Sequence, residues 1–224
     1  MGNYYNFALC NPQYLPFHCI NMYFKTAPWF LRAILPSNLE WVVSTGQKEI
    51  FLTFDDGPIP EITPWVLEKL DEFKAKATFF CVGDNVSRHP EIFSELGKLG
   101  HSVGNHSFNH VKAWHTSFDD YIKNVEQCNE LVHSSLFRPP HGQITPRLAK
   151  VLGRQYRLIM WSLLSRDFDC NMSVHRCLKT VIELTGPGSI VVFHDSVKAW
   201  ERLEFTLPRF LEHFTGLGYT FSTL

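Results

Sequence analysis

Strand-like segments alternate with helix-like segments along most of this chain. Short apolar runs such as residues 48–54 and 189–193 end at turns, and segments with helical spacing of apolar residues follow them. This alternation indicates parallel βα units, and about seven strands favour barrel-like closure over an open sheet. We therefore predict an α/β fold, a distorted (β/α) barrel with about seven repeats. The predicted strands are 48–54, 77–82, 101–104, 135–138, 156–162, 189–193 and 219–222. The predicted helices are 63–73, 90–99, 118–134, 145–153, 173–184 and 197–214, the first with Thr63 as its N-cap.

The 224 residues suit one domain with a short extension. We expect the domain to span residues 48–224. Residues 1–47 form an N-terminal extension that packs on the domain or precedes it. Within the extension, residues 1–21 look less like domain sequence than the run after Met22. We therefore expect them to be an upstream addition or a disordered tail, with native translation starting at Met22.

Charge and hydropathy exclude two classes of partner. The net charge is −1 and no basic patch is seen, which argues against nucleic-acid binding. Residues 15–35 are apolar, but Lys25 and Arg32 interrupt them, so no transmembrane segment is predicted. The chain start does not look like a signal peptide, and the six cysteines form no CxxC pair. Free thiols and a cytoplasmic location are the expectation.

Two short motifs carry groups that could act on a metal and a water. Asp55 and Asp56 follow the first strand, where a turn can aim both carboxylates into one cleft, although Asp-Gly is also a common turn signal. His106 and His110 are four residues apart, a spacing that on a helical turn puts both imidazoles on one face. Two histidines and one carboxylate make a three-ligand set of the kind that binds Zn²⁺ and leaves a position for water. Such ligands also suit Co²⁺, Ni²⁺ or Fe²⁺.

Two further segments carry groups for stabilising and protonating a reacting centre. Arg138 precedes Pro139, Pro140, His141 and Gly142, a turn that can aim a backbone N–H at a developing oxyanion. The Arg138 guanidinium can hold a carboxylate by paired hydrogen bonds.

His194 follows the last strongly apolar strand and can donate a proton to a leaving amine. A carboxylate such as Asp167 would raise its pKa. Each of these segments could also be an ordinary loop or a core histidine.

Taken together and in this order, the segments resemble the polysaccharide deacetylase family, also called the NodB homology domain or carbohydrate esterase family 4. The resemblance covers residues 48–224, and its most specific pair is TFDDG at 53–57 followed by HSFNH at 106–110. It implies that Asp55 is the catalytic base and that Asp56, His106 and His110 hold the metal. The implied reaction is hydrolysis of acetyl groups from N-acetylated sugars, which breaks a carbon–nitrogen bond of a linear, non-peptide amide.

The resemblance also implies roles for the later motifs. Arg138 orients the base, the backbone N–H of His141 joins the oxyanion site, His194 is the acid and Asp167 tunes it. Substrate contacts are expected at a further set of residues: Pro139, Pro140, Trp161 and Phe168.

This chain departs from the family pattern at three positions. His141 stands where an aromatic residue is common, Leu164 replaces the first carboxylate of the fourth motif, and Val192 replaces a leucine. The backbone N–H at residue 141 does not depend on the side chain, so the oxyanion donor is still expected. The change at His141 is expected to alter the wall of the substrate subsite, because its side chain differs, and the missing carboxylate at Leu164 removes one expected group near the proposed acid.

Other functions remain open from the residues alone. The same site could serve an O-acetyl xylan esterase or a small-molecule amidohydrolase, and a degenerate barrel could bind carbohydrate without turnover. The presence of every group needed for the chemistry favours the deacetylase. The expected partner is an acetylated carbohydrate substrate; the oligomeric state is not readable from the sequence.

Overall fold

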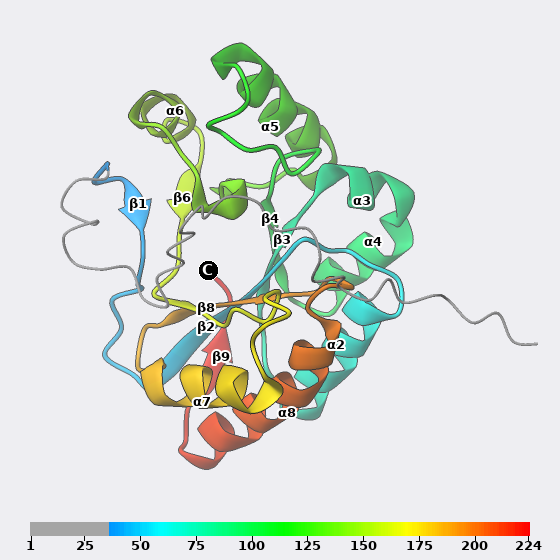
Figure 1. Cartoon of the computed structure of the whole chain (residues 1–224), viewed down its shortest axis with the longest axis vertical. Helices are drawn as coiled ribbons and strands as arrows, with labels where there is room; N and C mark the ends of the chain where they lie inside the picture. Colours follow the sequence, from blue (N-terminus) through cyan, green and yellow to red (C-terminus); the bar gives the residue numbers. More distant parts are fainter. Residues whose placement is uncertain (1–35) are drawn as a thin grey trace, which may run out of the picture.

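Nine strands form one sheet in residues 36–224, the part of the chain that this computed structural model describes (Figure 1). The strands are β1 Leu39–Glu40, β2 Glu49–Asp55, β3 Thr78–Cys81, β4 Ser102–Asn105, β5 Leu136–Phe137, β6 Arg157–Ile159, β7 Leu163–Leu164, β8 Ile190–His194 and β9 Thr220–Ser222. The helices are α2 Ile62–Glu72, α3 Gly83–Arg88, α4 Pro90–Lys98, α5 Phe118–Val132, α6 Pro146–Leu152, α7 Val174–Leu184 and α8 Trp200–Gly216. The short 3-10 turn η1, Pro140–Gly142, follows β5.

The sheet is parallel and curls back toward itself. Its strand order is β1-β6-β5-β4-β3-β2-β8-β7, with β9 pairing with β2. Just beyond β1, Val42 forms an antiparallel bridge with Ser189, and the Val43 N–H donates to the Gly188 carbonyl at 2.9 Å. These contacts join the β1 side of the sheet to the start of β8. The prediction of a distorted (β/α) barrel is confirmed, with strands inside and helices outside (Figure 1).

The prediction of one strand over residues 156–162 was wrong, because within this segment the chain passes from one edge of the sheet to the other. Met160 N–H donates to the Glu40 carbonyl beside β6, whereas Ser162 N–H donates to the Ile190 carbonyl beside β8. Trp161 therefore lies at the crossing between two sides of the sheet. β7 follows just beyond the predicted strand, and together with the two-residue β1 it raises the strand count to nine in the described residues.

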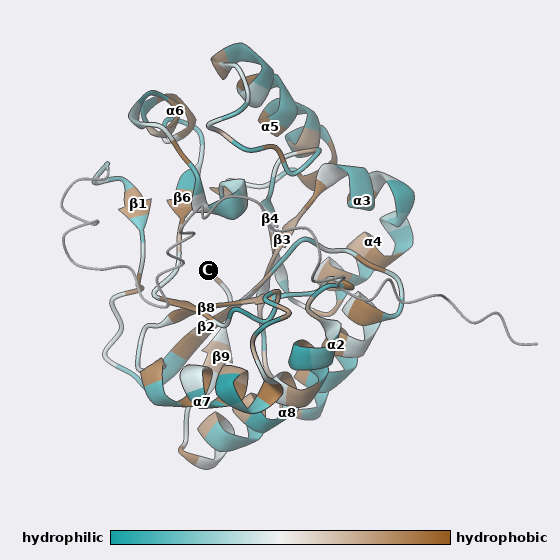
Figure 2. Ribbon diagram, viewed as in Figure 1, coloured by the Kyte–Doolittle hydropathy of each residue, from teal (hydrophilic) through white to brown (hydrophobic). Residues whose placement is uncertain are grey.

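The central strands are buried on both faces, as expected for a parallel sheet covered by helices. Phe54 of β2 stacks against Phe79 of β3 with ring centroids 5.0 Å apart, and lies 6.2 Å from Phe193 of β8. Figure 2 shows β2 and β8 as largely hydrophobic ribbons, and a mixture of hydrophilic and hydrophobic residues along the surrounding helices. This core fixes β2 and β8 side by side, with Asp55 in register with His194.

Two helix predictions need correction. His106 and His110 lie in a loop after β4 and not on a helix. Helix α2 begins at Ile62, so Thr63 lies inside its first turn and is not the N-cap. Helix α3 was not predicted; its sequence is short and polar, without a clear apolar period.

The extension can be followed only in part. Residues 36–47 pack on the sheet through β1, while the predictions for residues 1–21 and for a start at Met22 lie outside the described residues. Within residues 36–224, no helix is long and apolar enough to cross a membrane. In that same range Cys81, Cys128, Cys170 and Cys177 are free.

Candidate active site

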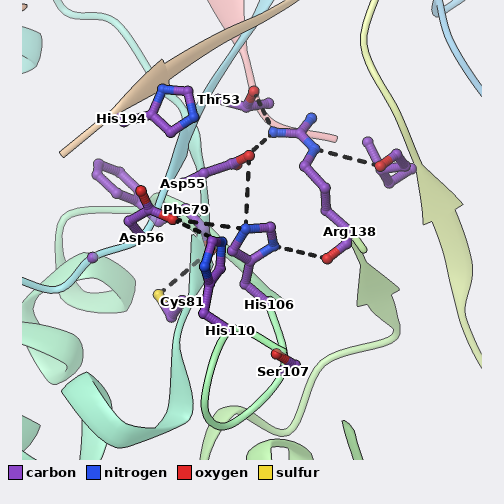
Figure 3. Close-up of polar contacts among 12 residues, drawn as sticks. Thr53, Asp55, Asp56, Phe79, Cys81, His106, Ser107, His110, Arg138 and His194 are labelled. Atoms are coloured by element: carbon purple, nitrogen blue, oxygen red, sulfur yellow. Dashed lines mark hydrogen bonds and ion pairs between the residues drawn. The ribbon is translucent and has the colours of Figure 1, made fainter. Parts of the chain in front are cut away.

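The predicted functional side chains converge at the carboxyl ends of β2, β4, β5 and β8, where parallel α/β barrels place their chemistry. Most of them line a cleft of about 1010 Å³, whereas Arg138 and Asp167 are fully buried and do not line it. Its lining includes the carboxylates of Asp55 and Asp56 and the imidazoles of His106, His110, His141 and His194. Figure 3 shows Asp55, Asp56 and the two loop histidines facing one another.

Asp55 and Arg138 form a buried ion pair. One guanidinium nitrogen, Nη1, donates to the Asp55 carboxylate at 2.6 Å and to the Thr53 hydroxyl at 2.8 Å. The other nitrogens reach the carbonyls of Ile159 and Met160, so the guanidinium is held on all sides. Arg138 is fully buried, which makes the loss of its partner costly. The pair fixes Asp55 at the edge of the cleft (Figure 3).

Asp56, His106 and His110 bring three ligand atoms within 4.8 Å of one another. The Asp56 carboxylate lies 3.2 Å from His110 Nε2 and 3.9 Å from His106 Nε2. The loop bends at His110, whose φ is +53°, so a turn and not a helix brings the imidazoles together. The structure thus brings the predicted pair together, but through a turn in a loop and not through a helical turn.

The donor set fits a divalent metal ion. His106 Nδ1 lies 2.7 Å from the Arg138 carbonyl, and since a carbonyl only accepts, the ring must donate there. The lone pair of His106 therefore sits on Nε2, which faces Asp56, an arrangement typical of metal-binding histidines. Burial lowers the pKa of His106 to about 4, which keeps the ring neutral as a ligand must be. Burial acts to raise the pKa of Asp56, but the imidazoles of His194 and His110 outweigh it and lower that pKa.

The partly buried His194 forms a second pair with the fully buried Asp167. His194 Nδ1 lies 2.7 Å from one oxygen of Asp167, and the His194 backbone N–H donates to the other at 2.8 Å. Burial acts to lower the pKa of His194, but the Asp167 carboxylate outweighs it and raises that pKa to about 9. The imidazole is therefore held protonated at neutral pH, with Nε2 free to donate.

The turn after Arg138 presents the backbone of His141. The backbone N–H groups of Gly142 and Gln143 donate hydrogen bonds to the carbonyls of Pro139 and Pro140, respectively. The His141 N–H makes no hydrogen bond to any other residue in the described range. The φ of +58° at His141 sets this orientation. The His141 ring lies against His110, with centroids 4.4 Å apart.

Three of the four predicted substrate contacts line the cleft: Pro139, Trp161 and Phe168. Phe168 stands edge-on to His194, with centroids 4.9 Å apart. Pro140 is buried and is not among the residues that line this cleft. Gly142 is required beside Trp161, because an added Cβ would come within 2.4 Å of that ring.

Some supporting residues were not found from the sequence. Asn85 donates to the Asp56 carbonyl at 2.7 Å, and Arg202 donates through Nε to the Asp167 carbonyl. Asp195 accepts from the Gly57 N–H at 3.0 Å. The position of Asp195, directly after His194, was the only feature of the sequence that could have pointed to it. Asn85 and Arg202 lie on helices whose sequences carry no motif.

Comparison with known proteins places the chain among deacetylases. Residues 43–156 match the family model described as polysaccharide deacetylase. A peptidoglycan-N-acetylglucosamine deacetylase of Bacillus cereus is 34% identical, over 82% of this chain and 90% of that protein. A chitooligosaccharide deacetylase of Azorhizobium caulinodans is 30% identical, over 68% of this chain and 76% of that protein.

A solved structure agrees with these sequence matches. The crystal structure of the Bc1960 peptidoglycan N-acetylglucosamine deacetylase superposes with a TM-score of 0.77 at 25% identity. The match covers 88% of this chain and 95% of that chain. The fold, the ordered motifs and these likenesses lead to one conclusion: this chain belongs to the polysaccharide deacetylase family.

Proposed function

We propose that this protein is a metal-dependent N-deacetylase that hydrolyses acetyl groups from N-acetylglucosamine-containing glycans. Residues 48–224 would form the catalytic domain. One observation carries the proposal: a single cleft gathers a three-ligand metal set, a carboxylate held by a buried arginine and a protonated histidine held by a buried carboxylate. Its relatives act on peptidoglycan and chitooligosaccharides by name. A cytoplasmic location stays a prediction from the sequence.

Asp56, His106 and His110 would hold the metal, and Zn²⁺ suits their carboxylate and imidazole donors best, with Co²⁺, Ni²⁺ or Fe²⁺ as other candidates. When bound there, such an ion supplies Lewis-acid chemistry, lowering the pKa of a water and polarising the acetamide carbonyl.

The remaining groups complete the reaction. Asp55 is the base that takes the proton from the attacking water, and Arg138 fixes its free oxygen toward the cleft. The unpaired N–H of His141 stabilises the oxyanion as the carbonyl carbon becomes tetrahedral. His194, protonated through Asp167, gives its Nε2 proton to the departing amine as the carbon–nitrogen bond breaks. Acetate and a free amino sugar are the products.

Two lysines favour a glycan that carries carboxylates. Lys112 and Lys198 both line the cleft and are exposed, and neither forms an ion pair with another residue in the range 36–224. Peptidoglycan bears carboxylates on its stem peptides, and on muramic acid wherever the peptide has been removed, whereas chitin oligomers are neutral. Because cationic walls raise the local concentration of anionic substrates, we expect peptidoglycan fragments to be the better substrates.

Acetate release from a glycan panel is the direct test. The panel holds N-acetylglucosamine oligomers, peptidoglycan fragments and acetylated xylan, each assayed after chelation and again after Zn²⁺ or Co²⁺ is restored. We expect release from the N-acetylated glycans only with metal present.

Release from acetylated xylan alone would identify an O-acetyl esterase instead. No release from any glycan by metal-loaded protein would overturn the proposal in favour of a small-molecule amidohydrolase. Failure to bind metal would favour a binding protein.

The alkaline limit of activity should follow the His194–Asp167 pair. In the folded protein the pKa of His194 is raised to about 9 from an ordinary value of 6.5. The stability that this pair contributes is therefore fully present below pH 6.5 and is lost as pH rises through about 9, where His194 gives up its proton. In Asp167→Asn, burial still lowers the His194 pKa and only the Asp56 and Asp55 carboxylates still raise it, so that pKa should fall well below 9. NMR titration of His194 in metal-free protein measures this directly. A bound cation would lower the value further.

The same variant should move the alkaline limb of the pH–rate profile to lower pH. His175, a histidine on α7 whose ring packs against Phe205, serves as an internal reference in the same spectra. An unchanged His194 titration in Asp167→Asn would contradict the assigned role of Asp167.

A further inference from the structure

The turn that carries both catalytic carboxylates is held in an unusual conformation. Asp56 has a φ of +83°, a region that residues other than glycine rarely adopt. Such backbone persists only where neighbouring groups over-determine it. The Asn85 side chain holds the Asp56 carbonyl on one side at 2.7 Å. Asn85 contacts only one side of the turn, so a second group on the side of β8 is needed to fix it.

Asp195 is that group, and it does not line the cleft. Its Oδ1 accepts from the Gly57 N–H at 3.0 Å, and its Oδ2 accepts from the Thr63 hydroxyl at 2.6 Å. Thr63 Oγ1 in turn accepts from the Ile59 N–H at 2.8 Å. The Asp195 backbone N–H also donates to the Asp55 carbonyl at 3.2 Å. One buried residue thus ties the turn, the loop behind it and the start of α2 to the end of β8.

The contact with Gly57 is too close for any other residue. A Cβ at position 57 would come within 2.0 Å of the Asp195 carboxylate. The turn and Asp195 therefore fit together as one unit. Because Asp56 and Asp55 immediately precede Gly57, any shift of this unit moves both carboxylates relative to His106 and Arg138.

We propose that Asp195 is a positioning residue, whose hydrogen bonds to Gly57 and Thr63 set the orientation of Asp56 toward the metal and of Asp55 toward the attacking water. The inference deepens the proposed function and rests on it for its effect on turnover. Its effect on metal affinity stands apart from the identity of the substrate. Removing a group behind a metal ligand typically costs about 10- to 100-fold in metal affinity or activity.

The test is calorimetric titration of Zn²⁺ into chelator-treated protein, with a competing chelator to reach tight affinities. Asp195→Ala should bind Zn²⁺ at least about 10-fold more weakly, because Gly57 N–H and Thr63 lose their partner and the turn relaxes. Asp195→Asn should stay close to the wild type, since its amide can accept from Gly57 and donate to Thr63 Oγ1. Burial raises the pKa of Asp195 to about 8, so an uncharged side chain suits this place.

Two further variants separate positioning from stability. Thr63→Val removes one of the two contacts with little change of shape and should weaken Zn²⁺ binding less than Asp195→Ala does; it also serves if Asp195→Ala fails to fold. Val66→Ala removes buried methyl groups one turn along α2 without touching the turn. It should lower the melting temperature and leave Zn²⁺ affinity unchanged.

Wild-type Zn²⁺ affinity in both Asp195→Ala and Thr63→Val would overturn the proposal. Equal losses in Asp195→Ala and Asp195→Asn would also overturn it, because charge and not hydrogen-bond geometry would then be responsible. If the wild type binds Zn²⁺ but deacetylates no glycan, the proposed function fails while this inference is still decided by the affinities.

Discussion

Replacing Asp55 by asparagine should lower kcat by about 100- to 10,000-fold, the range that a positioned general base supplies. An amide keeps the size of the carboxylate and can still accept from Arg138 Nη1, which lies 2.6 Å away in the wild type. It cannot take a proton from water. The measurement is acetate release at saturating substrate with metal restored. Zn²⁺ affinity should change little, because Asp55 lies outside the proposed ligand set Asp56, His106 and His110.

Asp71→Asn is a matched control for this experiment. Asp71 is an exposed carboxylate near the end of α2, so the same chemical change there should leave kcat unaltered. A large loss of Zn²⁺ affinity in Asp55→Asn would instead make Asp55 a ligand, and a wild-type kcat would remove it from the chemistry.

Replacing Arg138 by methionine should lower the free energy of unfolding by about 3–5 kcal/mol, the cost of leaving a buried charge without its partner. Arg138 is fully buried, and its loss leaves the Asp55 carboxylate and two backbone carbonyls without the hydrogen bonds that it donates. Urea unfolding monitored by circular dichroism measures the change. Activity should fall as well, because Asp55 would lose the hydrogen bond from Arg138 that fixes it at the edge of the cleft.

The chain offers a surface pair for comparison. Arg157 pairs with Glu40 at 2.8 Å, but its side chain is 48% exposed, so Arg157→Met should cost no more than about 1 kcal/mol. Adding Asp55→Leu to Arg138→Met should recover part of the lost stability, because the stranded charge disappears. A cost for Arg138→Met no larger than that for Arg157→Met would contradict the buried-pair interpretation.

The predicted site residues largely came together, for a reason that the sequence already holds. Asp55, Arg138 and His194 each follow an apolar strand, and in a parallel sheet the carboxyl ends of strands meet at one edge. Strand alternation and motif order were therefore enough to gather them. The local geometry was less accessible: the histidine pair sits on a loop with φ of +53° at His110, which spacing cannot distinguish from a helical turn.

The sequence by itself determined the parallel α/β barrel, the order of its motifs and the acidic and histidine residues of those motifs that meet at one edge of the sheet. These follow from local periodicity and from residues that stand directly after strands. Only the tertiary structure decided which groups support them, namely Asp195 behind Gly57, Asn85 behind Asp56 and Arg202 behind Asp167. Partners such as Gly57 and Asp195 are 138 positions apart in the chain. Their pairing depends on how strands register and helices pack, and no local pattern of residues encodes that contact.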